Sequence, residues 1–154
     1  YAGQFYPTQL AIEKGYNQVI WTDDNTHEHI EEAGAMNIFV RINDTLITAP
    51  TSDRILDGIT RKSIIDIAKA EKIPVEVRKI TVKEVVEAAQ NGSLKEMFGA
   101  GTAAVISPIS TFGHRGTDYD LPELDASYAS LLKKKITDIQ YNKTEDNFGW
   151  RVKI

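Results

Sequence analysis

Residues 31–39 read Glu-Glu-Ala-Gly-Ala-Met-Asn-Ile-Phe, and this stretch carries the strongest signal for both fold and chemistry. Two adjacent carboxylates are followed by a short turn of small residues and then by an apolar strand. Because burying an unpaired charge is costly, a glutamate beside a buried strand needs a cation as its partner. Neighbouring residues on a strand point to opposite faces, so only one of Glu31 and Glu32 can face the interior. A solvated acidic strand end is the simpler alternative, and the spacing alone slightly favours it.

Two glycine-containing segments further along the chain are typical of anion sites. Gly58, Ile59 and Thr60 open a predicted helix, whose free N–H groups and positive dipole end suit a phosphate. The alternative is an ordinary helix cap by Asp57. The segment Gly101-Thr102-Ala103 offers a hydroxyl and backbone N–H groups, although it could simply be a tight turn before a strand. Together with the glutamates, these segments predict a zwitterionic or phosphorylated ligand.

The composition is that of an ordinary globular domain. The 154 residues are 42% hydrophobic and 26% charged, with a net charge of -4, which is enough chain for one core. Scattered Lys and Arg residues argue against nucleic-acid binding, and no apolar run is long enough to cross a bilayer. The absence of cysteine excludes disulfides and thiol catalysis and favours a cytoplasmic setting.

The histidines and the common catalytic motifs add little. His27 and His29 could bind a metal, but no third ligand lies nearby, so exposed histidines are the better interpretation and we predict no metal site. The sequence holds no Gly-x-Ser-x-Gly elbow and no P-loop lysine. The chemistry therefore depends on the glutamates and the glycine segments.

The hydrophobic pattern predicts a single α+β domain. Helices are expected over 6–14, 57–71, 81–90 and 122–141, and strands over 17–21, 32–42, 45–48, 75–80 and 103–109. The sequence Thr81-Val82-Lys83-Glu84 is a capping box that marks the start of the third helix. The same pattern at Ser93–Glu96 predicts a short turn. The hairpin and the glycine turns argue against a simple parallel βαβ series.

Three ordered motifs resemble the fold-type IV pyridoxal-phosphate enzymes, and specifically the branched-chain amino acid aminotransferases. The motifs are residues 31–39, Leu56–Arg61 and Met97–Ala103, and the resemblance covers essentially the whole chain. It implies an α+β fold with mixed strands curled into a pseudo-barrel with flanking helices. It also implies transamination between leucine, isoleucine or valine and 2-oxoglutarate. The cofactor would be pyridoxal 5'-phosphate, and the parent protein would be a homodimer or a higher oligomer.

The resemblance also implies a role for each site residue. Glu32 would pair with the pyridinium nitrogen of the cofactor, and Tyr1 would contact the phenolic oxygen. The segment Gly58-Ile59-Thr60 would hold the phosphate together with the hydroxyl of Thr102. The turn Gly101-Thr102-Ala103 would meet the substrate carboxylate through its backbone N–H groups.

By the same resemblance, residues 1–154 are the larger, C-terminal domain of such an enzyme. The smaller N-terminal domain and the Schiff-base lysine, which precedes Tyr1 in the family, would be absent. We therefore expect no catalytic residue in this chain, and expect the chain alone to be inactive. Two alternatives remain open. One is another fold-type IV enzyme, such as a D-amino acid aminotransferase or an aminodeoxychorismate lyase, and the other is a non-catalytic domain that binds a partner or a small phosphate.

Overall fold

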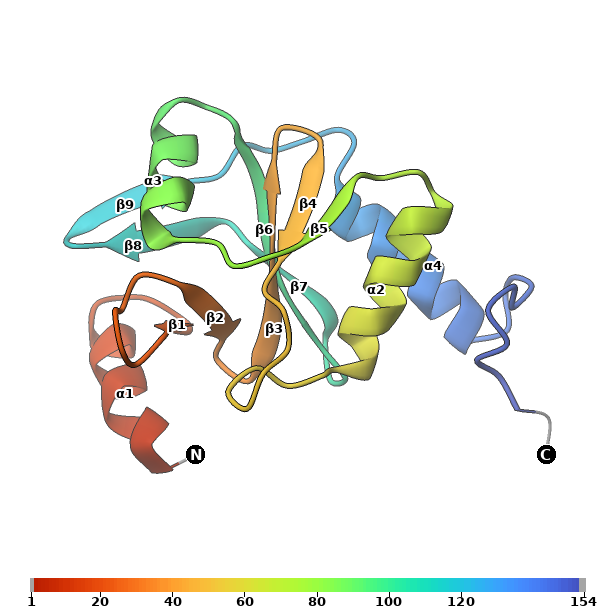
Figure 1. The fold of residues 1–154 in the computed structure, drawn as a ribbon, viewed down its shortest axis with the longest axis horizontal. Coiled ribbons are helices and arrows are strands. Elements are labelled where there is room, and N and C mark those ends of the chain that lie inside the picture. The colour runs from red at the N-terminus through yellow and green to blue at the C-terminus, as the bar shows by residue number, and fades with distance from the viewer. Residues whose placement is uncertain (1, 153–154) are drawn as a thin grey trace.

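The computed structural model describes residues 2–152 and has a mixed α+β fold, as predicted (Figure 1). Its main sheet has seven strands in the order β1-β2-β3-β4-β5, with β6 on the other edge of β3 and β7 beyond β6. Strands β8 and β9 form a separate hairpin. Neighbouring strands are antiparallel except for β4 and β5, so the sheet is not a parallel βαβ series.

The described helices and strands have the following bounds. The helices are α1 (Phe5–Glu13, after a 3-10 turn over Ala2–Gln4), α2 (Ile59–Ala70), α3 (Val82–Gln90) and α4 (Tyr128–Gln140). The strands are β1 (Ile20–Thr22), β2 (Ile30–Ala33), β3 (Met36–Ile42), β4 (Thr45–Thr48), β5 (Val75–Val77), β6 (Leu94–Gly101), β7 (Val105–Ile109), β8 (Thr111–His114) and β9 (Thr117–Asp120).

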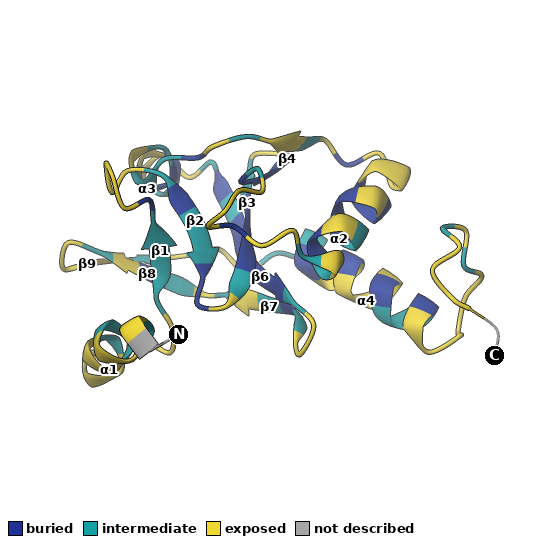
Figure 2. Ribbon diagram, turned by 60° about the horizontal axis from the view of Figure 1, so that its bottom comes forward, coloured by how far each residue is buried: buried dark blue, intermediate teal, exposed yellow. Residues whose placement is uncertain are grey.

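Strand β3 is the centre of the molecule. β2 pairs with its first residues, β4 with its last ones, and β6 runs along its opposite edge. Both faces of β3 are buried as well. Phe39 packs with α2 and α4, while Ile38 and Val40 pack with α3 and β8, so the middle of the strand has the dark blue of buried residues in Figure 2. Phe39 also stacks on Phe98 of β6 with ring centroids 5.2 Å apart, a cross-strand aromatic pair that stabilises the sheet.

The local helix signals are confirmed. The side chain of Thr81 accepts a hydrogen bond from the backbone N–H of Glu84 at 3.0 Å and so caps the helix, while the Glu84 carboxylate pairs with Arg78 instead of closing the capping box. Gly15 follows α1 with a φ of +87°, a left-handed conformation that glycine adopts readily. Helix α2 lies within the predicted range and buries one face, including Ile64 and Ile67, against the sheet and α4.

The predicted strand over 32–42 is wrong, because a turn divides it. Gly34, with a φ of +61°, and Ala35 reverse the chain, so that Glu32 on β2 pairs with Asn37 on β3. The predicted strand over 103–109 is also too long, because residues 102–104 form the turn between β6 and β7. Pro108 is tolerated in β7 because this strand lies at an edge of the sheet.

Two further boundaries are wrong because long-range contacts override local patterns. Ser93–Glu96 resembles a capping box, yet Leu94 begins β6 and Glu96 is buried in the sheet. The last helix begins at Tyr128 rather than near Pro122, because Glu96 of β6 accepts hydrogen bonds from the backbone N–H groups of Tyr128 and Ala129, and Ser127 caps the helix.

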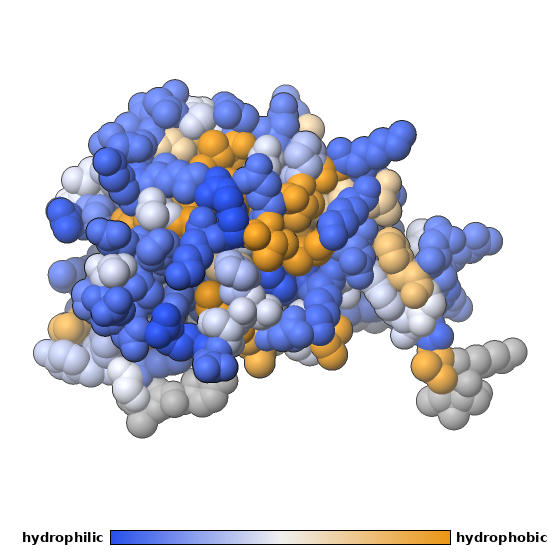
Figure 3. Space-filling model, in the orientation of Figure 1, coloured by the Kyte–Doolittle hydropathy of each residue, from blue (hydrophilic) through white to orange (hydrophobic). Residues whose placement is uncertain are grey.

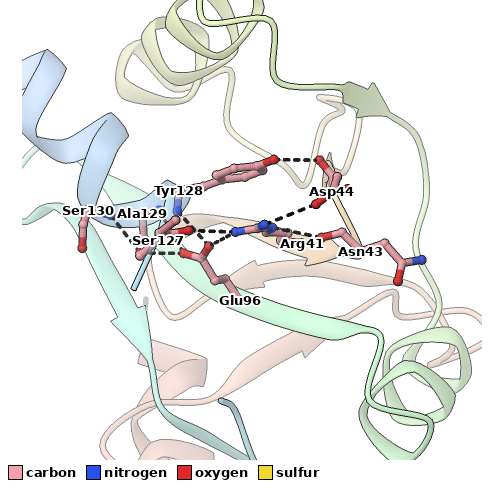
Figure 4. A network of polar contacts seen from close by, with 9 residues as sticks. Arg41, Asn43, Asp44, Glu96, Ser127, Tyr128, Ala129 and Ser130 are labelled. Atoms are coloured by element: carbon pink, nitrogen blue, oxygen red, sulfur yellow. Dashed lines mark hydrogen bonds and ion pairs between the residues drawn. The ribbon is translucent and has the colours of Figure 1, made fainter. Parts of the chain in front are cut away.

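A buried carboxylate holds the start of α4 against the sheet (Figure 4). Glu96 accepts hydrogen bonds from Ser127 Oγ at 2.8 Å and from the backbone N–H groups of Tyr128 at 2.8 Å and Ala129 at 3.0 Å. Arg41 of β3 binds Glu96 at 2.7 Å, and its guanidinium lies 3.7 Å from the centre of the Tyr128 ring. Burial raises the pKa of Glu96, but these hydrogen bonds outweigh burial and hold the pKa below its usual value.

The surface is mostly polar. In the view of Figure 3 hydrophobic side chains gather near the middle of the face, where β4 and β5 lie in Figure 1. Helix α1 has no buried residue among those described, and it exposes Phe5, Tyr6 and Ile12. Within residues 2–152, none of the helices has both the length and the apolar character that a membrane span requires.

Replacing Glu96 with Gln is expected to lower the free energy of unfolding at neutral pH by about 3 kcal/mol, because the half-buried Arg41 would lose the closer and more buried of its two carboxylate partners. The folded-state pKa of Glu96 is depressed, so its contribution is present above the unfolded pKa of about 4.3 and is lost as the pH falls through the folded value. Urea unfolding at neutral and at acidic pH should therefore show a smaller pH dependence for E96Q than for wild type. The exposed Glu76 supplies the control E76Q, and equal pH profiles for both variants would contradict this assignment.

Candidate active site

Three segments that the sequence analysis singled out meet at the beginning of β3. Asn37 pairs with Glu32 of β2 on one edge and with Ala100 of β6 on the other. A Cβ atom on Gly58 would overlap Asn37 Oδ1, so the backbone before α2 contacts the same side chain. In Figure 1 the loop over 49–58, the start of α2 and the turn between β6 and β7 gather at the lower end of the molecule.

Glu31 forms an ion pair with a basic residue of this chain. Its Oε1 accepts a hydrogen bond from Arg54 Nε at 3.0 Å, and Arg54 also pairs with Asp24 at 2.6 Å. The hydrogen bond with Glu31 is the main reason that the pKa of Arg54 is raised. This pairing ties the loop over 49–58 to β2 and accounts for the charge of Glu31.

Glu32 has hydrogen-bond donors but no such cation. Its Oε1 accepts from the backbone N–H of Leu56 at 3.1 Å and from Asn37 Nδ2 at 3.4 Å. Within residues 2–152, no basic side chain pairs with Glu32, and its Oε2 has no hydrogen-bond partner. Glu32 lines an open pocket of about 410 Å³ together with the loop Thr51–Asp57. A half-buried carboxylate with one free oxygen suits a cationic group on a ligand.

Helix α2 begins beside this carboxylate without a side-chain cap. Its N-cap is Gly58, and no side chain of a described residue caps the helix. Asp57 instead forms an ion pair with Lys62 at 2.6 Å, so the alternative of capping by Asp57 is wrong. The N–H groups of the first turn, which includes Ile59 and Thr60, have no partners within the helix and form the positive end of its dipole.

A buried cation lies in the same first turn of α2. Arg61 is 5% exposed, and its Nη2 donates to the carbonyl of Ala49 at 2.9 Å. Its Nε is buried without a hydrogen-bond partner in the described part of the chain. Burial lowers the pKa of Arg61, and the charge of Asp57 offsets this only in part. A guanidinium placed at the positive end of a helix dipole adds to a potential that favours a bound anion.

The turn between β6 and β7 occupies the same end of the sheet. Thr102 and Ala103 are exposed, and Gly101 is the last residue of β6. A Cβ atom on Gly99 would lie 2.7 Å from Met36 Cε, and one on Gly101 would lie 3.2 Å from Met36 Cγ, so these glycines make room for Met36. No hydrogen bond links the turn to Glu32 or Thr60 among the residues that the structure describes.

One predicted site residue lies outside the part of the chain that the structure describes, and two buried residues at the site had no predicted role. Tyr1, the predicted contact of the phenolic oxygen, lies outside the described residues. The sequence analysis gave no role to Asn37 and Arg61. Both are buried, and they donate hydrogen bonds to the carbonyls of Leu56 and Ala49 respectively. The available signal for Asn37 was a single amide at the start of an otherwise apolar strand. Leu56 and Ile59 are large apolar side chains, 72% and 80% exposed, beside the carboxylate and the helix start.

The chain belongs to the class IV aminotransferases. A family model described as amino-transferase class IV matches residues 1–112. Among curated proteins, branched-chain-amino-acid aminotransferase 2 of Bacillus subtilis is 39% identical over all of this chain, which spans 43% of that relative's length. A mitochondrial branched-chain-amino-acid aminotransferase of Schizosaccharomyces pombe is 39% identical over 99% of this chain and 38% of its own length.

Solved structures of two branched-chain aminotransferases share the fold. The enzyme of Thermoproteus uzoniensis, determined with norvaline, superposes with a TM-score of 0.78 at 29% identity over 97% of this chain and 46% of its own. The Escherichia coli enzyme gives a TM-score of 0.79 at 26% identity over 97% of this chain and 47% of its own. The predicted fold-type IV architecture is therefore confirmed, and this chain spans about half the length of the proteins it matches.

Replacing Gly58 with Ala is expected to lower the free energy of unfolding by about 1–3 kcal/mol, because the new methyl group would displace the buried Asn37 side chain. Gly3 provides a matched control, since a Cβ atom there meets nothing within 4 Å. G3A is expected to stay within about 0.5 kcal/mol of wild type. Urea unfolding measures both, and equal stabilities for G58A and G3A would contradict the close packing of Gly58 on Asn37.

Proposed function

We propose that the full-length gene product containing this chain is a branched-chain amino acid aminotransferase. It would use pyridoxal 5'-phosphate to transfer amino groups between leucine, isoleucine or valine and 2-oxoglutarate. The observation that carries the proposal is Glu32, a half-buried carboxylate without a basic partner within residues 2–152, beside the uncapped start of α2. The names of the Bacillus subtilis and Schizosaccharomyces pombe relatives support the substrate class.

The residues present fit the two charged ends of this cofactor. Glu32 would bind the protonated ring nitrogen through its free oxygen, and the exposed side chain of Leu56 would contact the face of the aromatic ring. The segment Gly58-Ile59-Thr60 would hold the phosphate at the start of α2, with a further hydroxyl from Thr102. When bound, the cofactor supplies an electron sink for amino-group transfer.

The residues of this chain would have separate roles in binding the cofactor and the substrate. The carboxylate of Glu32 would keep the ring nitrogen protonated, because an opposite charge nearby favours the charged form. The buried Arg61 would add positive potential behind the phosphate. The backbone N–H groups of the turn Gly101-Thr102-Ala103 would bind the carboxylate of the substrate. Tyr1 would contact the phenolic oxygen of the cofactor.

We further propose that residues 1–154 form the larger, C-terminal domain of this enzyme. The shares of 43% and 38% that the chain spans in its two named relatives support a single domain of a longer protein. Assembly of the parent protein as a homodimer or higher oligomer and its cytoplasmic location stay predictions.

The first test compares wild type with E32Q in the full-length gene product. E32Q is expected to reduce kcat for L-leucine and 2-oxoglutarate by about 100-fold, because a neutral amide would no longer favour the charged ring. Glu28, an exposed carboxylate just before β2, supplies the control E28Q, which should stay within about twofold of wild type. Transamination of D-amino acids but not of L-leucine by the wild-type protein would overturn the proposed substrate class.

A second test concerns the phosphate end. T60A and T102A are each expected to weaken binding of pyridoxal 5'-phosphate about tenfold, because each removes one hydrogen bond to a charged group. Binding of pyridoxal, which lacks the phosphate, should be unchanged. Thr137, whose hydroxyl bonds to the carbonyl of Lys133 within α4, supplies the control T137A. Fluorescence titration measures all affinities, and equal losses for both ligands would argue against a phosphate site at the start of α2.

A further inference from the structure

Asn37 is a buried polar residue in a strand that is otherwise apolar at its core. It is 5% exposed, whereas the three residues that follow it on β3, Ile38, Phe39 and Val40, are buried and apolar. A buried amide is unfavourable unless its donors and acceptor find partners. The partners of Asn37 therefore indicate what the side chain does.

The amide nitrogen of Asn37 joins two parts of the candidate active site. Nδ2 donates to the carbonyl of Leu56 at 2.8 Å and lies 3.4 Å from Glu32 Oε1. The N–H of Leu56 donates to that same oxygen of Glu32 at 3.1 Å. Leu56 is thus bound at its N–H by the carboxylate and at its carbonyl by the amide, so the three residues form a closed set of hydrogen bonds.

The other contacts of Asn37 extend to the two segments that are predicted to bind anions. Asn37 Oδ1 packs so closely on Gly58 that a Cβ atom would not fit there, and the carbonyl of Gly58 accepts the hydrogen bond from Lys62 N at 3.0 Å that starts α2. On the opposite edge of β3, Asn37 pairs with Ala100, which is followed by Gly101 and Thr102. One buried residue therefore touches Glu32, the helix start and the strand that leads to the turn.

We propose that Asn37 is the positioning residue of this site, which sets Glu32 and the start of α2 at a fixed separation. Its amide and the Leu56 N–H occupy Glu32 Oε1, so Oε2 is the oxygen presented to the ring nitrogen. Without Asn37 the carboxylate could rotate, and the loop before α2 would lose its anchor. Both ends of the cofactor would then bind less tightly. The identity of this ligand rests on the proposed function, whereas the contacts belong to the chain itself.

The test uses the full-length gene product and compares N37A with T48V. Thr48 is a matched control, because it is 2% exposed on β4 and its hydroxyl donates to the carbonyl of Ile38 at 2.8 Å, with no hydrogen bond to Glu32 or Gly58 among the described residues. Both variants are expected to lower the thermal midpoint of the apoprotein, since each loses a buried hydrogen bond. Only N37A is expected to weaken binding of pyridoxal 5'-phosphate, by about 10- to 100-fold, as loss of a supporting contact does at other sites.

Pyridoxal and a double variant separate positioning from general destabilisation. N37A is expected to weaken both pyridoxal and its phosphate, because the ring end and the phosphate end are both displaced. The loss in the double variant N37A/E32Q should be smaller than the product of the two single losses, since Asn37 acts through Glu32. If N37A does not fold, N37S retains a small polar group that is too short to reach Leu56, and it should show the same losses.

Three outcomes would overturn the inference. Unchanged affinity in N37A or N37S, with binding intact in wild type, would remove the role of Asn37 and leave the proposed function standing. The same conclusion would follow if T48V lost as much affinity as N37A. A wild-type protein that binds neither pyridoxal nor its phosphate would overturn both the proposed function and the inference that rests on it.

Discussion

The structure depends on the pairing of β3 along both of its edges. This strand takes neighbours from β2 and β4, which adjoin it in the sequence, and from β6, which lies much further along the chain. With both faces also buried, β3 has almost no freedom to shift its register, because a slip of one residue would exchange its two faces. Asn37 lies at the beginning of this strand, so its position is fixed by the same pairing. The segments of the candidate active site lie next to Asn37.

Some charged side chains form ion pairs with other residues of the chain, and others form none among the described residues. Glu31 has Arg54, and Glu96 has Arg41 together with the start of α4. Glu32 and Arg61 differ from them, since neither forms an ion pair with another described residue. Glu32 is hydrogen-bonded to Leu56 in the loop before α2, and Arg61 lies in the first turn of that helix. An unpaired carboxylate and an unpaired guanidinium at one location fit a ligand that carries both signs of charge.

Local signals in the sequence were sufficient for part of the fold. The helix cap by Thr81 and the position of α2 depend on residues within one or two helical turns, and both were predicted correctly. The start of β6 was missed because the burial of Glu96 depends on Arg41 and on the start of α4, which are distant in sequence. Contacts between residues distant in sequence also limited the prediction of the site. The sequence indicated that one glutamate would face a ligand, but the cation for Glu31 comes from a loop that no spacing rule connects to it.

The arrangement of strands also bears on how the protein folds. β2, β3 and β4 are joined by short turns, so their hairpins can form early from contacts between nearby residues. β6 must close a far longer loop before it reaches β3, and that step carries a larger entropic cost. Since Ala100 and the turn that follows it arrive with β6, the two sides of the site come together in the slower event. A chain in which this strand has not yet paired would already hold Glu32 next to Asn37, yet it would lack the turn Gly101-Thr102-Ala103 at the site.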